Sequence, residues 1–133
     1  MKYIRPYCLF HALIWLPWGL LCVVDIRLIE NIIAVSSALP HGQTDIRAMY
    51  GGVQSAMGLM ALLACIKPRY FSQFVFALAF IAGGLALSRT SGLFVDGSYG
   101  LYTGAVLAYE YFAACSAMLW LMFLSKLNHF SNE

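Results

Sequence analysis

The sequence predicts an all-α integral membrane protein with four transmembrane helices packed as a bundle. Of its 133 residues, 62% are hydrophobic and only 11% are charged, whereas soluble proteins average about half apolar and about a quarter charged residues. A soluble domain this short would leave many of these side chains in water. Four spans of about 20 residues use roughly 80 residues, which leaves short loops and tails. We therefore expect a single transmembrane domain over residues 1–133.

The first apolar stretch is expected to span the membrane over residues 7–24. Lys2 and Arg5 precede it, as they would precede the core of a signal peptide, but no small-x-small cleavage site follows. We therefore interpret this stretch as an uncleaved span. Pro17 lies inside it and removes one backbone donor, so we expect a kink, which membrane helices tolerate.

The segment 25–45 is too polar to cross a bilayer as a whole, and we expect it to be an external loop. Its middle, residues 26–39, is apolar enough to form an interfacial helix.

Spans two and three are expected over residues 46–66 and 70–88. Between them, Lys67-Pro68-Arg69 combines charge with a helix breaker. Such a short connection predicts an antiparallel pair of spans.

A polar loop, residues 89–100, is expected before span four, residues 101–124. The Asp96-Gly97 pair in this loop is a turn signal. The tail, residues 125–133, is polar and expected to fray.

The distribution of basic residues predicts the orientation, because short cytoplasmic segments collect Lys and Arg. One side of the four-span arrangement carries Lys2, Arg5, Lys67, Arg69 and Lys126. The other side carries Arg27, Arg47 and Arg89, accompanied by Asp25, Glu30, Asp45 and Asp96. We therefore expect both termini in the cytoplasm. A net charge of +2 with scattered basic residues excludes nucleic-acid binding, which needs a clustered basic face.

Small residues are spaced as in membrane helices that pack closely. Ala48, Gly52 and Ala56 recur every four residues along span two. Further small residues are Gly83 and Gly84 in span three and Ala113, Ala114 and Ala117 in span four. These favour a compact helical arrangement, within the chain or with a neighbour.

Glu110 is the most notable ionisable residue, because charged groups inside a membrane are costly and mark candidate sites. It follows Leu101 by about nine residues, which at 1.5 Å per residue places it roughly 14 Å into a core about 30 Å thick. Arg47 and Arg89 are the nearest cations on that half of the bilayer.

Span two has one polar and small face that includes Arg47, Tyr50 and Gln54. Packing this face against that of Glu110 would form an outward-opening pocket, with Arg89 and Asp96 at its mouth. The candidate ligand-binding or ion-pair residues are Arg47, Tyr50, Gln54, Arg89, Asp96 and Glu110. Three interpretations stay open for them: a structural ion pair, a ligand pocket, and catalysis with Glu110 as acid or base.

No metal or other cofactor is expected. The histidines His11, His41 and His129 are dispersed, so no convergent ligand set is visible. The four cysteines Cys8, Cys22, Cys65 and Cys115 lack CxxC spacing. We interpret them as free thiols that behave as small hydrophobic side chains.

The segment Asp45-Ile46-Arg47-Ala48-Met49-Tyr50-Gly51-Gly52 resembles a bacterial family of four-span membrane proteins known only as domain of unknown function 4345. Arg89, Asp96-Gly97 and Glu110 also match its pattern, while Ser88 replaces a glycine. The resemblance extends over most of the chain. It implies the same topology and polar residues in a bacterial inner membrane, and no known activity.

We therefore expect a small non-catalytic protein of the bacterial inner membrane. It would be a subunit of a larger membrane complex or a binding protein for an anionic amphiphile, with membrane lipids as partners. The alternative is a membrane-embedded enzyme that acts on a lipid or isoprenoid through Glu110.

Overall fold

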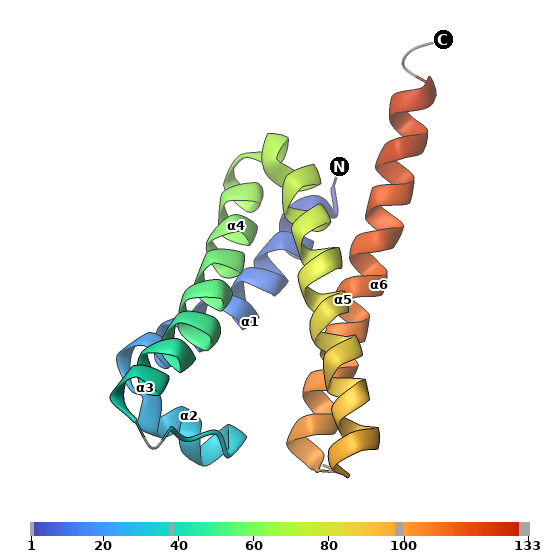
Figure 1. Ribbon diagram of the computed structural model, residues 1–133. Coiled ribbons are helices and arrows are strands. Elements are labelled where there is room, and N and C mark those ends of the chain that lie inside the picture. Colours follow the sequence, from blue (N-terminus) through green and yellow to red (C-terminus); the bar gives the residue numbers. More distant parts are fainter. Residues whose placement is uncertain (1, 38, 98–99, 131–133) are drawn as a thin grey trace. The chain divides into compact units, whose positions relative to one another are not determined.

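The computed structural model describes residues 2–37, 39–97 and 100–130, and within these ranges all regular structure is helical (Figure 1). The elements are α1 (Ile4–Val24), α2 (Ile26–Ile33), α3 (Pro40–Ile46), η1 (Arg47–Val53), α4 (Gln54–Ile66), η2 (Pro68–Tyr70), α5 (Phe71–Asp96) and α6 (Leu101–Phe130). Element η1 is a π-helix and η2 a 3₁₀-helix.

Four continuous helical stretches are long and apolar enough to cross a membrane: Ile4–Val24, Pro40–Ile66, Pro68–Asp96 and Leu101–Leu127. The prediction of an all-α protein with four spanning helices is therefore confirmed. The orientation of these helices in the membrane stays a prediction.

The chain divides into two compact units, Met1–Phe71 and Ser72–Glu133. The first unit contains α1 to α4 with η1 and η2, and the second contains α6 and all of α5 after its first residue. Each unit is described by itself below.

Helix α1 of the first unit approaches η1 and α4 at glycine residues. A Cβ added at Gly58 would lie 2.5 Å from the backbone nitrogen of Leu16, and one added at Gly51 would lie 2.5 Å from Cγ2 of Val23. Gly19 of α1 lies in the same way against the backbone of Ser55. No larger side chain fits between these backbones, as expected for helices that associate by close packing.

The face of span two that packs against α1 is not the stripe of Ala48, Gly52 and Ala56, for which packing against a neighbour stays a prediction. Ala48, Gly52 and Ala56 are exposed, and a Cβ added at Gly52 would have no neighbour within 4 Å. Gly51 and Ser55 repeat the same four-residue spacing one position earlier, and these are the residues that face α1. Spacing alone does not distinguish two such adjacent stripes.

The loop before span two contains a shorter helix than predicted. Helix α2 begins after Asp25, whose carboxylate accepts a hydrogen bond of 3.0 Å from the backbone N–H of Arg27, an N-cap that satisfies a free donor. It ends at Ile33 rather than residue 39, because Ala34 adopts the left-handed conformation with φ 55°. The helix of span two then begins at Pro40 and not at residue 46. Proline suits this first turn, where no N–H is needed.

Helix α5 continues beyond the predicted end of span three at Ser88 and reaches Asp96. Polar side chains fit inside it because Thr90 Oγ1 donates to the Ala86 carbonyl at 2.7 Å and Ser91 Oγ to the Leu87 carbonyl at 3.0 Å. Gly97, with φ 61°, follows the helix end, and because residues 98 and 99 lie outside the described residues, the turn at Asp96-Gly97 stays a prediction.

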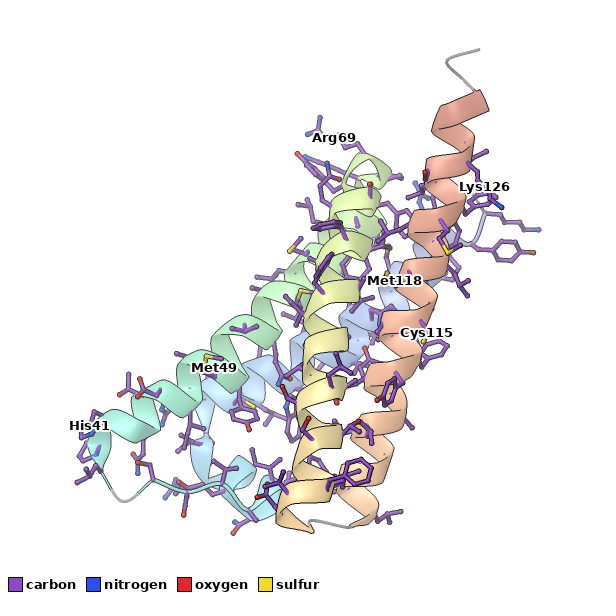
Figure 2. The ribbon with its side chains drawn as sticks, turned by 45° about the vertical axis from the view of Figure 1, so that its right-hand side comes forward. His41, Met49, Arg69, Cys115, Met118 and Lys126 are labelled. Carbon is purple, nitrogen blue, oxygen red and sulfur yellow. The ribbon has the colours of Figure 1, made fainter. Side chains whose placement is uncertain are left out.

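Helix α6 extends through most of the predicted tail to Phe130, and residues 131–133 of that tail lie outside the described residues. Its apolar side chains, including Met118, are widely exposed (Figure 2), as expected for a helix that faces lipid.

Pro17 lies inside the unbroken helix α1.

Candidate functional site

An ion pair links the two helices of the second unit. Arg89 of α5 donates from Nε to Oε2 of Glu110 in α6 and from Nη2 to Oε1, both at 3.0 Å. The side chain of Glu110 is 4% exposed and that of Arg89 27%. Two parallel hydrogen bonds between guanidinium and carboxylate form the strongest geometry of this pair.

A second polar contact lies beside the ion pair. The hydroxyls of Thr90 and Tyr111 are 2.9 Å apart. Because the Thr90 hydroxyl donates its proton to the Ala86 carbonyl, the Tyr111 hydroxyl donates to Thr90. We call Arg89, Glu110, Thr90 and Tyr111 the polar clasp. The two helices also pack closely about one turn further along α6 from Glu110, where a Cβ added at Gly83 would lie 3.8 Å from Cβ of Ala114.

The first unit holds the other candidate arginine. Arg47 is half-buried at the start of the π-helix η1, and its Nη1 donates to the backbone carbonyl of Val23 at the end of α1. Last-turn carbonyls lack an intrahelical partner, so Arg47 caps α1. Among the described residues Arg47 makes no ion pair with a carboxylate. π-Helical turns are frequent at functional sites.

An open pocket of about 400 Å³ lies beside this arginine. It is lined by Val24, Asp25, Ile26, Arg27, Gln43 and Arg47. We call it the Arg47 pocket. Asp25 and Arg27 form an exposed pair, with 3.4 Å between Oδ1 and Nε. Polar groups from α2, α3 and η1 thus meet the apolar side chains of Val24 and Ile26 in one place.

The six predicted site residues are divided between the units. Arg47, with half-buried Tyr50 and Gln54 further along span two, belongs to the first unit. Arg89, Glu110 and exposed Asp96 belong to the second. The second unit brings Arg89 to Glu110. A pocket that combines residues of both units stays a prediction.

Sequence reasoning missed the neighbours of Arg47, namely Asp25, Arg27 and Gln43. One signal was available. Asp25 directly after an apolar span and before Ile26-Arg27 is an N-cap pattern, and it predicts that a new helix turns away at that point. Gln43 carried no such signal, because segment 40–45 was assigned to the loop.

The histidines and cysteines that the structure describes differ in their burial. His11 is buried in α1 and His41 is exposed in α3, while the side chain of His129 lies outside the described ones. Within the part of the chain that the structure describes, no three His, Cys, Asp or Glu side chains gather as metal ligands. The four cysteines are free thiols, of which Cys8 and Cys22 are buried.

Comparison with known proteins identifies the family. No curated protein and no solved structure matches the chain. The model of the family described as Domain of unknown function (DUF4345) matches residues 5–121. This range contains the Arg47 pocket and the polar clasp. The match covers well over half of the sequence, and the chain therefore belongs to the DUF4345 family.

Proposed function

We propose that this multi-pass membrane protein is a non-catalytic binding protein of the bacterial inner membrane that holds an anionic amphiphile at the Arg47 pocket. One observation carries the proposal. Arg47 lies at an open pocket with a guanidinium that no carboxylate of the described residues neutralises.

The hydrogen bonds of Arg47 leave some of its N–H donors available to a ligand. A guanidinium has five N–H donors, and Arg47 gives one nitrogen, Nη1, to the Val23 carbonyl. That bond holds the side chain in place and leaves donors available to a ligand. Arg89 differs, because it directs Nε and Nη2 at the carboxylate of Glu110. Of these two arginines, Arg47 is the better candidate for binding an anion.

The surroundings of Arg47 fit an amphiphile. Val24 and Ile26 line the same pocket as the charged groups, so a ligand would meet apolar and polar surface together. A charge-assisted hydrogen bond contributes about 1.5–3 kcal/mol, and the apolar side chains offer van der Waals packing to the apolar part of the ligand. Both contributions are available at this one site.

The geometry of Glu110 favours a non-catalytic role. Both carboxylate oxygens accept hydrogen bonds from Arg89, and the side chain is 4% exposed. A general acid or base must lie within hydrogen-bond reach of the substrate proton. Glu110 would have to leave its partner first, so the ion pair supports a structural role for it.

Lipid retention by purified protein tests the proposal. The wild type, Arg47→Gln and Arg69→Gln would be purified in a mild detergent from bacterial membranes, and bound acidic amphiphiles would be measured by mass spectrometry. Arg69 is the matched control, because it lies in the same unit, bonds to the hydroxyl of Tyr70 and is not part of the Arg47 pocket.

We expect Arg47→Gln to retain about tenfold less of the acidic amphiphile, which corresponds to the loss of one charge-assisted hydrogen bond, while Arg69→Gln behaves as wild type. Because Arg47 also caps α1, Arg47→Lys is included as a variant that keeps the charge. Lipid retention is compared only among variants that unfold at the same temperature as the wild type. Equal retention by wild type and a folded Arg47→Gln variant would overturn the proposal.

A further inference from the structure

We propose that the amphiphile in the Arg47 pocket is a lipid with a singly charged phosphodiester headgroup. This inference rests on the proposed function and deepens it, because it names the ligand class.

The charge of the pocket matches a monoanion. Its lining contains two guanidinium groups, on Arg27 and Arg47, and one carboxylate, on Asp25. The carboxylate already pairs with Arg27, which leaves one net positive charge, centred on Arg47. A phosphodiester carries one negative charge, whereas a phosphomonoester carries up to two near neutral pH. A doubly charged group would leave one charge unmatched beside Asp25.

The donors of the pocket match phosphate oxygens. Arg47 comes from η1, Gln43 from α3 and Arg27 from α2, so three residues whose side chains carry N–H donors line one volume from three elements. A phosphodiester has two unesterified oxygens that a guanidinium can bind in parallel. The amide of Gln43 offers further neutral donors to ester or hydroxyl oxygens.

The size of the pocket favours a headgroup over a bare carboxylate. The open volume of about 400 Å³ is many times the space of about 10–15 Å³ that one water molecule needs. A phosphate with an attached glycerol has about ten non-hydrogen atoms, and a volume of this kind has room for it. The carboxylate of a fatty acid has only two oxygens and would leave most of the volume to water.

The apolar surface next to the pocket favours a lipid over a free phosphodiester. Val24 lines the pocket and is 78% exposed, and Leu20, one turn earlier on α1, is 51% exposed. Residues four apart on a helix share a face. An acyl chain attached to a headgroup in the pocket would therefore continue along the lipid-facing surface of α1.

Binding measurements with delipidated wild-type protein in detergent test this inference, with native mass spectrometry as the readout. The probes are phosphatidylglycerol, oleate and the soluble headgroup glycerophosphoglycerol. Gln43→Glu places a negative charge in the pocket at an exposed position. Gln73→Glu makes the same change at an exposed residue of α5 outside the pocket and serves as control.

We expect the wild type to bind phosphatidylglycerol at least tenfold more tightly than oleate or glycerophosphoglycerol. Gln43→Glu should weaken phosphatidylglycerol binding about tenfold through like-charge repulsion, and Gln73→Glu should not. If the wild type bound oleate but not phosphatidylglycerol, and Arg47→Gln lost the oleate binding, this inference would be overturned and the proposed function would stand. If glycerophosphoglycerol and phosphatidylglycerol bound equally well, the acyl chains would not contribute to binding, and the claim that the phosphodiester belongs to a lipid would be overturned. Absence of binding to all three probes would overturn both proposals.

Discussion

Arg89 and Glu110 join α5 to α6 through two parallel hydrogen bonds of 3.0 Å, with the carboxylate almost fully buried and the guanidinium 27% exposed. A single charge inside a membrane is costly and is usually paired. The pair therefore defines which residues of the two helices face each other. Removing one partner leaves the other without its counter-charge, so the stability of the second unit depends on both.

Glu110→Gln should destabilise the protein. Breaking a buried ion pair by removing one partner costs about 3–5 kcal/mol, and we expect the lower end because Arg89 is partly exposed. Thermal unfolding of the purified variant in detergent measures the loss. The double variant Arg89→Met with Glu110→Leu removes both charges, and it should be more stable than Glu110→Gln. If Glu110→Gln unfolded at the wild-type temperature, the ion pair would have no structural role.

Tyr111→Phe should have a smaller effect, because it removes one hydrogen bond, from the Tyr111 hydroxyl to Thr90. A neutral hydrogen bond contributes about 1 kcal/mol. A double-mutant cycle with Thr90→Val isolates this contact. The Thr90→Val change alone also removes the bond to the Ala86 carbonyl, so it should cost more than Tyr111→Phe. Additive losses in the cycle would show that the two hydroxyls do not interact.

The composition predicted the fold class, but it did not identify the partner of Glu110. Arg47 and Arg89 were both predicted on the same half of the bilayer as Glu110, and depth in the membrane alone does not show which of them is its partner. The antiparallel course of α5 and α6 around Gly97 brings residue 89 opposite residue 110. Span three was predicted to end at Ser88 because the next residues are polar. Their bonds to carbonyls of the preceding turn make them compatible with a helix.

The Arg47 pocket could not be predicted in full for a related reason. The face containing Arg47, Tyr50 and Gln54 was derived with the period of an α-helix, whereas Arg47–Val53 forms a π-helix with a wider turn. Residues 40–45 were assigned to a loop, so Gln43 was not considered near Arg47. The structure instead continues the helix of span two back to Pro40, which places Gln43 one turn before Arg47.

Gly58→Ala should destabilise the first unit. The new Cβ would lie 2.5 Å from the backbone nitrogen and 2.6 Å from Cα of Leu16, and a backbone cannot rotate away as a side chain can. Overpacking costs about 1–3 kcal/mol, which exceeds the gain of about 1 kcal/mol in helix propensity. Thermal unfolding in detergent measures the difference.

Gly52→Ala is the matched control for this change, because its new Cβ would have no neighbour within 4 Å. This variant should unfold at the wild-type temperature or slightly above it. Equal stability of Gly58→Ala and Gly52→Ala would contradict the close approach of α1 and α4.

The last prediction concerns the side of the membrane on which the Arg47 pocket opens. Lys2, Lys67 and Lys126 are predicted from the sequence to lie on one side of the membrane, and lysines collect in the cytoplasm. Topology reporters fused after Ile66 and at the C-terminus should therefore be cytoplasmic, and a reporter inserted within residues 34–39 should be external. The pocket residues Asp25, Arg27 and Gln43 flank that insertion, so an external signal would place the pocket in contact with the outer leaflet. An external C-terminus would contradict the orientation, and the lipid bound at Arg47 would then have to come from the cytoplasmic leaflet.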